Sequence, residues 1–246
     1  MQTDSLYSKP VVVNRQTHAA VRLRGATNFA FARQLPAVPL LLSEFGAASG
    51  SMPVVFSEDA QGDLCAQAVL GTRQGENVFV GAGGEWRPQA YVPAYWRRSP
   101  FTFLETEAEG QEQLVLCMDS AAEHLTFEES ADRSEESQVA TVGLFDEGVV
   151  DHALAFCNAF QRDWQQTQKF IASLKLHDLI VPRRVTVREE GQQRVLEGLW
   201  AVDAARLDDL PSKKYLRLRK EGYLPAIYAH LNSWRLFERL VKANVS

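Results

Sequence analysis

A change in the period of hydrophobic residues near position 148 constrains the fold of this chain more than any other feature. From Gly148 to Leu176, apolar side chains recur at spacings of three or four residues, which is the repeat of one face of an α-helix. Asp151 lies near the start of this run and Lys175 near its end, so each offsets the partial charge of the helix dipole there. The sequence therefore predicts one long amphipathic helix over residues 148–176.

Short β-strands are the expected structure on both sides of this helix. Apolar runs of strand length fill residues 9–118: KPVVVN, AAVRLR, FAFAR, MPVVF, LCAQAVLG, NVFVG, FTFLE and EQLVLCM. Glycine permits the positive φ angles of tight turns, so we expect hairpins at Gly62–Asp63, 73–77 and 81–84. After the long helix, residues 183–202 predict two more strands joined by a turn.

Short helices are expected in two further places. Residues Val38–Ala48 place apolar side chains on one helical face, and a proline is tolerated in a first helical turn. Near the end of the chain, Asp203 can cap one helix, Pro211 can start the next and Gly222 can end it. Pro225 then opens a last helix or helix pair with an apolar stripe.

An acidic segment separates the strand-rich and helix-rich parts. It begins at Asp119, its further acidic residues include Glu123, Glu128, Glu129, Asp132, Glu135 and Glu136, and Arg133 is its one arginine or lysine. We expect a solvated connection over 119–145, with a contact for a basic partner as the alternative. The predicted fold is one α+β domain over 1–246, in which an antiparallel β-rich region (1–118) packs against a helix-rich region (146–246).

Composition excludes several classes of function. A formal net charge of -5 and a pI near 5.6 argue against general affinity for nucleic acid or anionic lipid. No apolar stretch is long enough for a membrane span. The first residues lack the pattern of a secretory signal, and the odd cysteine count of Cys65, Cys117 and Cys157 fits free, buried thiols in a reducing compartment. We therefore expect a cytoplasmic protein.

No catalytic or cofactor signature is found in the sequence. The run GAGGEW at 81–86 lacks the last glycine of a dinucleotide loop, and the five histidines are scattered. Glu105, Glu107 and Glu109 alternate along a strand and share a face that could coordinate a hard cation, but a solvated strand face explains them equally. We predict no catalytic residues, metal or cofactor. Whether the protein is an enzyme stays open, although the sequence favours a protein that is not an enzyme.

The strongest candidate for a binding site is YVPAYWRRSPF, residues 91–101. Aromatic rings supply flat apolar contacts and guanidinium groups recognise carboxylate or phosphate. Consecutive side chains of a strand point to opposite faces, so at most one arginine would face a given pocket. The structural alternative is that the rings fill the core and an arginine pairs with a local carboxylate. The predicted ligand-binding residues are Tyr91, Tyr95, Trp96, Arg97 and Arg98.

The chain resembles the SapC family of bacterial proteins from end to end. Four places carry the resemblance: VVVNRQTHAAVRLR with FAFAR, VPLLLSEF with MPVVF, LGTRQGENVFVGAGGEWRPQAYVPAYWRRSPF, and LEGLWAVDAARLDDLP with LPAIYAHLNSWRLFERL. Trp96 and Ser99 depart from the small aliphatic and the aromatic residue expected there. The resemblance implies an association with bacterial surface-layer proteins. It also implies that the protein is encoded near outer-membrane receptors and flavin-dependent halogenase-like proteins. The resemblance implies no catalytic residues for this chain.

These observations favour a non-enzymatic accessory or binding protein that recognises a peptide, an amino acid or a partner protein through residues 91–101. One alternative is an enzyme or cofactor-dependent partner of an oxidative, halogenase-like system, with catalytic groups assembled from residues distant in sequence. Another is a structural component of envelope or surface-layer assembly. The sequence leaves the oligomeric state open.

Overall fold

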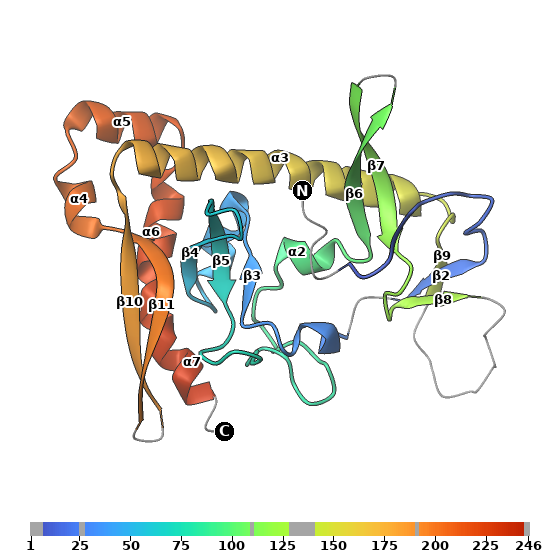
Figure 1. Ribbon diagram of the computed structural model, residues 1–246, viewed down its shortest axis with the longest axis horizontal. Coiled ribbons are helices and arrows are strands. Elements are labelled where there is room, and N and C mark those ends of the chain that lie inside the picture. Colours follow the sequence, from blue (N-terminus) through green and yellow to red (C-terminus); the bar gives the residue numbers. More distant parts are fainter. Residues whose placement is uncertain (1–6, 25–27, 109–110, 128–140, 190–191, 244–246) are drawn as a thin grey trace. The chain divides into compact units, whose positions relative to one another are not determined.

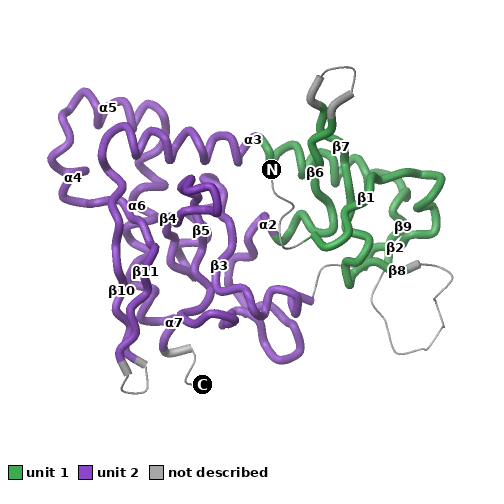
Figure 2. The backbone as a smooth tube through the Cα atoms, in the orientation of Figure 1, with its two compact units in different colours: residues 1–27, 96–161 green, residues 28–95, 162–246 purple. Residues whose placement is uncertain are grey.

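The structure is a computed structural model of the chain (Figure 1). It describes residues 7–24, 28–108, 111–127, 141–189 and 192–243. The chain forms two compact units, and each unit takes two separate segments of the sequence (Figure 2). Unit 1 comprises residues 1–27 and 96–161, and unit 2 comprises residues 28–95 and 162–246. Antiparallel sheets accompanied by helices make the fold α+β, as the sequence predicts.

Unit 1 contains two three-stranded antiparallel sheets and the first part of helix α3. The sheets have the strand orders β1-β7-β6 and β8-β2-β9. The elements are β1 (Pro10–Val12), β2 (Val21–Arg24), β6 (Phe101–Ala108), β7 (Gln111–Asp119), β8 (Leu125–Phe127), β9 (Thr141–Gly143) and α3 (Val149–Leu176). The long helix expected over 148–176 is therefore confirmed.

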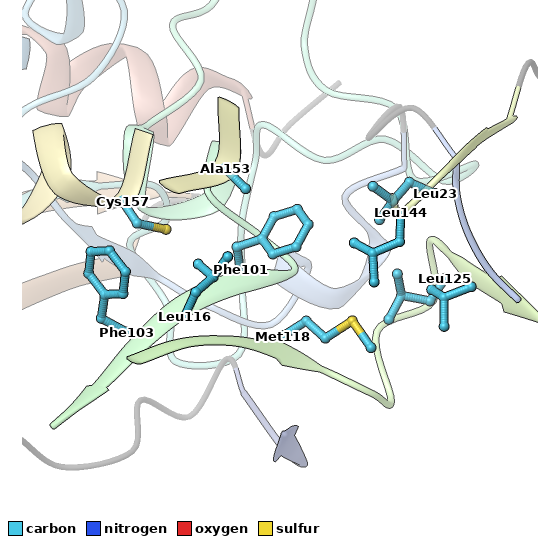
Figure 3. Close-up of a cluster of buried hydrophobic side chains, with 10 residues drawn as sticks. Leu23, Phe101, Phe103, Leu116, Met118, Leu125, Leu144, Ala153 and Cys157 are labelled. Carbon is cyan, nitrogen blue, oxygen red and sulfur yellow. The ribbon is translucent and has the colours of Figure 1, made fainter. Parts of the chain in front are cut away.

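Strands β6 and β7 present one apolar face to the core of unit 1 (Figure 3). Phe101 is paired with Met118 and Phe103 with Leu116. Residues paired across two strands lie on the same face, and so do residues two apart in one strand. The rest of this core comes from β2, β8, α3 and the segment before α3: Val21, Leu23, Leu125, Leu144, Ala153 and Cys157.

Unit 2 is built around a five-stranded antiparallel sheet with the order β10-β11-β4-β5-β3. Its strands are β3 (Ala37–Pro39), β4 (Val54–Glu58), β5 (Leu64–Val69), β10 (Ile180–Glu189) and β11 (Gln192–Val202). Its helices are η1 (Ala30–Ala32), η2 (Leu42–Glu44), α1 (Phe45–Ala48), α4 (Ala204–Asp208), α5 (Ser212–Lys220), α6 (Leu224–Ser233), η4 (Trp234–Leu236) and α7 (Phe237–Ala243). Helix α6 contacts β4 and β11, and α7 contacts β10.

Aromatic rings fill the core of unit 2. Phe170, from the later part of α3, is fully buried. Its ring centroid lies 5.8 Å from that of Phe45, 6.2 Å from that of Phe56 and 5.1 Å from that of Tyr223. These separations lie in the favourable range for tilted and edge-to-face pairs. One helical residue thus joins α1, the sheet and the start of α6.

The helix boundaries near the end of the chain are as the sequence predicts. Asp203 caps α4, and its carboxylate accepts a hydrogen bond from the amide of Ala205 at 3.0 Å. Pro211 immediately precedes α5, and Gly222, with φ +76°, follows its end. Pro225 occupies the first turn of α6. These boundaries follow from local chemistry, which does not depend on distant contacts.

Two of the expected hairpins form. The turn at Gly62–Asp63 joins β4 to β5, and residues 183–202 lie in the β10–β11 hairpin. Residues 81–84 form a turn that closes an isolated antiparallel bridge between Val80 and Trp86, beside which the amide of Arg87 donates to the carbonyl of Phe79 at 2.7 Å. The chain therefore reverses direction there as expected, but no regular strands flank the turn. Residues 73–77 do not join two regular strands either, although the amide of Val78 donates to the carbonyl of Leu70 at 2.9 Å.

Side-chain hydrogen bonds stabilise the loop that leads into this turn. Asn77 donates from its amide nitrogen to the carbonyl of Ala32 at 2.9 Å, and its oxygen accepts from the amide of Phe79 at 2.9 Å. Such bonds satisfy backbone groups that a strand ladder would otherwise use. The run FAFAR is likewise not a strand but contains the 3-10 helix η1, whose Ala30 amide donates to the side chain of Asn28.

The short helix expected over Val38–Ala48 is present only in its second part. Helical structure covers Leu42–Ala48, in η2 and α1. The residues before it form β3, in which Val38 pairs with Ala68. Pro39 is compatible with this arrangement because β3 lies at an edge of the sheet, where a missing backbone donor is tolerated.

The segment 119–145 is not simply a connection. Strands β8 and β9 lie within it, and both pair with β2 in unit 1. Most of its acidic residues, Glu128, Glu129, Asp132, Glu135 and Glu136, lie outside the described residues, as does the β10–β11 turn at 190–191. Across the described ranges, no helix combines the length and the apolar character needed to cross a membrane.

Candidate functional site

The candidate segment 91–101 forms a short helix and a turn rather than a strand. Helix α2 (Ala94–Arg97) ends next to Arg98, and the amide of Phe101 donates to the carbonyl of Arg98 at 2.8 Å just where β6 begins. Residues up to Tyr95 belong to unit 2, and those from Trp96 onward belong to unit 1. The two arginines have different environments: Arg97 is exposed, whereas Arg98 is 5% exposed.

The tyrosines of the candidate set have structural roles in unit 2. The hydroxyl of Tyr91 donates to Glu44 Oε1 at 2.7 Å, and the amide of Ala94 donates to the same oxygen at 2.6 Å. The second oxygen of Glu44 accepts from the amide of Leu41 at 2.8 Å. Glu44 is 3% exposed and Tyr95 is 7% exposed. These contacts tie the start of the candidate segment to η2 through a buried carboxylate.

Arg98 lies between two aromatic rings inside unit 1. Its guanidinium carbon is 5.2 Å from the centre of the Tyr7 ring and 4.4 Å from that of Phe160. Cation–π attraction is strongest where the cation is shielded from water. The Tyr7 hydroxyl donates to the carbonyl of Phe101 at 2.9 Å, which fixes the ring against β6. Trp96, also in unit 1, is 1% exposed.

A pocket of about 700 Å³ lies beside Arg97 in unit 1. Its walls come from the turn after α2 and from the start of α3: Arg97, Arg98, Ser99, Phe101, Glu147, Gly148, Val149, His152, Ala153 and Phe156. The guanidinium carbon of Arg97 is 5.6 Å from the centre of the Phe156 ring. Glu147 and His152 are exposed. The pocket therefore combines a cation, a carboxylate and an imidazole with apolar and aromatic walls.

The start of α3 places these side chains in the pocket. Gly148 has φ +82°, a conformation that glycine adopts without strain. The amide of His152 donates to the carbonyl of Gly148 at 2.8 Å in the first turn. Just before, the carboxylate of Asp146 accepts from the amide of Gly143 at 2.7 Å, which fixes the approach of the chain to the helix. Val149, His152 and Phe156 then share one helical face by their spacing.

The buried thiols of unit 1 are not poised as nucleophiles. Burial raises the pKa of Cys157 to about 11, and the positive charge of Arg98 only partly opposes this rise. Burial also raises the pKa of Cys117. A thiol with a raised pKa is protonated at neutral pH and reacts poorly. All three cysteines are free thiols, as expected, and Cys65 is the most exposed of them.

The described residues contain no cluster of three or more His, Cys, Asp or Glu side chains placed to hold a metal ion.

The fold and the site together define an α+β protein with antiparallel sheets and an arginine-lined pocket at the start of its long helix. The family model for SapC matches residues 13–240, so the chain belongs to the SapC family. A search of curated proteins gave no significant match, and neither did a search of solved structures.

The structure brings together part of the candidate set and adds residues that the sequence did not single out as binding residues. Arg97 and Arg98 line the pocket, and Ser99 lines it as well. Glu147 and His152 come from a segment about fifty residues further along the chain. Helical spacing could have predicted that His152 shares a face with Phe156, but only the fold places that face beside Arg97.

Proposed function

We propose that the protein is a non-enzymatic binding protein whose pocket at Arg97 recognises a free amino acid or the end of a peptide. The observation that carries the proposal is the presence of an exposed guanidinium and an exposed carboxylate, Arg97 and Glu147, in the walls of one pocket. A guanidinium binds a carboxylate with two parallel hydrogen bonds. The carboxylate of Glu147 complements an ammonium group.

The remaining walls suit the side chain of such a ligand. Phe101, Val149, Ala153 and Phe156 supply apolar surface, and a volume of about 700 Å³ is ordinary for a small-molecule site. The Phe156 ring under Arg97 also restricts the guanidinium, which lowers the entropy lost when a ligand binds. Cys157, which lies close enough to feel the charge of Arg98, stays protonated at neutral pH. A protonated thiol is a poor nucleophile, so it supports a binding role for the pocket rather than a role in thiol catalysis.

Isothermal titration calorimetry against free amino acids and dipeptides tests the proposal. We expect at least one ligand to bind, and Arg97→Ala to weaken it about tenfold or more, since hydrogen bonds to charged groups contribute about 1.5–3 kcal/mol. Arg15→Ala is the matched control, because Arg15 is also exposed and lies over an aromatic ring of unit 1, Phe145, at 5.7 Å. That variant should bind normally.

Chemical derivatives of the ligand separate the two charged contacts. An N-acetylated amino acid lacks the ammonium group and an amino acid amide lacks the carboxylate. Both should bind more weakly than the free amino acid. In Glu147→Gln, the preference for the free amine over the acetylated form should shrink, while the preference for the free carboxylate remains. Equal binding by Arg97→Ala and the unmodified protein would remove the pocket as the recognition site.

A further inference from the structure

Helix α5 (Ser212–Lys220) carries a dense positive charge on an otherwise acidic chain. Five of its residues are basic and exposed: Lys213, Lys214, Arg217, Arg219 and Lys220. The whole chain has a formal net charge of -5. The helix lies in unit 2 and is linked to α6 by a contact between the hydroxyls of Tyr215 and Tyr228 at 3.1 Å. A local excess of this kind attracts anionic groups even on a protein of opposite net charge, because salt screens distant charges.

Helix stability explains only part of this charge. Arg217, Arg219 and Lys220 lie in the last turn, where cations favour the negative end of the helix dipole, and Arg217 pairs with Glu221 at 2.8 Å. Lys213 and Lys214 lie at the opposite end. That first turn contains no acidic residue and has no side-chain cap, so both lysines oppose the dipole.

The positive charges of these two lysines are also not neutralised by ion pairs. Where the structure describes the chain, neither lysine is in a salt bridge. Lys213 lies four residues before Arg217 and Lys214 lies three residues before it, spacings at which like charges repel each other on a helix. Residues that weaken local structure without a compensating contact mark functional positions more often than others do.

An exposed leucine lies among these cations. Leu216 is 46% exposed, whereas Leu218, on the other side of α5, is fully buried. Lys213, Arg219 and Lys220 are three or four residues from Leu216, so they surround it on the helix surface. An apolar contact with a charged rim is the common arrangement of a protein-binding surface.

We propose that the exposed face of α5 is a docking surface for an acidic segment of a partner protein. Carboxylates of the segment pair with Lys213, Arg219 and Lys220, and an apolar side chain covers Leu216. A membrane-binding helix instead places a continuous apolar face in the lipid, and the apolar side of α5 is buried in unit 2 through Leu218. This surface is independent of the pocket at Arg97, which lies in unit 1.

The double variant Lys213→Glu/Lys214→Glu tests the proposal, because its expected effects on stability and on binding have opposite signs. Negative charge favours a helix N-terminus, so the urea midpoint of unfolding should rise or stay unchanged. The probe is a fluorescein-labelled synthetic peptide with three repeats of Glu-Glu-Leu-Glu, and its binding is measured by fluorescence anisotropy. Binding to the full chain should weaken about tenfold or more in the variant, and it should weaken with added salt.

Matched controls identify which feature of the surface is recognised. Arg188→Glu/Arg235→Glu makes the same change in net charge at two exposed residues of unit 2, on β10 and η4, and should leave binding unchanged. Leu216→Ser should weaken binding to the leucine-containing peptide but not to a version with serine at those positions. Equal loss in both double variants would show a nonspecific charge effect and overturn the proposal. Binding to phosphatidylserine vesicles without binding to the peptide, or binding to neither, would overturn it too.

Discussion

His230 should make the stability of unit 2 strongly dependent on pH. Its ring is fully buried, and its Nε2 accepts a hydrogen bond from the amide of Val202 at 3.0 Å. Its Nδ1 is 2.8 Å from the carbonyl of Val54, so the neutral tautomer with the proton on Nδ1 satisfies both contacts. The ring therefore joins β11, β4 and α6 only while it is uncharged.

Burial lowers the pKa of His230 from 6.5 to about 4, and the hydrogen bond to Val54 only partly opposes this shift. The unfolded chain takes up the proton more readily than the folded one, so folding stability is complete above pH 6.5 and is lost as the pH falls toward 4. The full loss is about 3 kcal/mol, since each pKa unit corresponds to about 1.4 kcal/mol. About 2 kcal/mol of this should be lost between pH 7 and pH 5.

Urea unfolding followed by circular dichroism between pH 7.5 and pH 5 measures this effect. His230→Phe removes the titrating group and should be less stable at pH 7.5 by about 2–5 kcal/mol, because two buried backbone groups lose their partners. Its stability should then fall much less on acidification. His124 and His177, whose pKa values are also lowered mainly by burial, remain in both proteins, so the difference in pH dependence isolates His230.

The reasoning fails if the two proteins lose the same stability between pH 7 and pH 5. Nuclear magnetic resonance of the unmodified protein gives a second measurement that does not require the variant to fold. The His230 ring should keep the chemical shifts of a neutral imidazole down to about pH 5. Protonation near pH 6.5 in the folded protein would contradict the buried position of the ring.

Two further predictions concern buried groups. Glu44→Ala should destabilise the protein by about 3–5 kcal/mol in urea unfolding, because three donors lose a buried charged acceptor. Tyr91→Phe removes only one of these donors and should destabilise it by about 1.5–3 kcal/mol. Equal losses of stability in the two variants would contradict the shared role of the carboxylate. Cys157 should resist iodoacetamide at pH 7.5 in the native protein, since its pKa is near 11, while the more exposed Cys65 reacts first by mass spectrometry; early labelling of Cys157 would contradict its burial.

The elements that the sequence predicts well are those that depend on nearby residues. The period of α3 and the capping of α4 by Asp203 involve groups within a few positions of one another. The β4–β5 hairpin follows from one glycine turn. Two of the regions predicted less well contain contacts between residues far apart in the sequence: Asn77 donates to the carbonyl of Ala32, and Val38 pairs with Ala68. Such a contact leaves no periodic signal in the sequence.

The candidate site was predicted only in part for a related reason. Residue types indicated that 91–101 could bind a ligand, and both of its arginines line a pocket. The sequence could not distinguish exposed Arg97 from buried Arg98, since both have the same local chemistry. It also gave no sign that Glu44 would bind Tyr91, or that Glu147 would face the same pocket as Arg97.

The sequence by itself determined the family, the α+β class and the long helix, because composition, motif order and hydrophobic period are properties of the chain. The tertiary structure alone decided which charged groups are buried and which meet in a pocket. Burial and proximity arise from contacts between residues far apart in sequence, and those contacts set the pKa of His230 and Cys157 and leave Arg97 exposed.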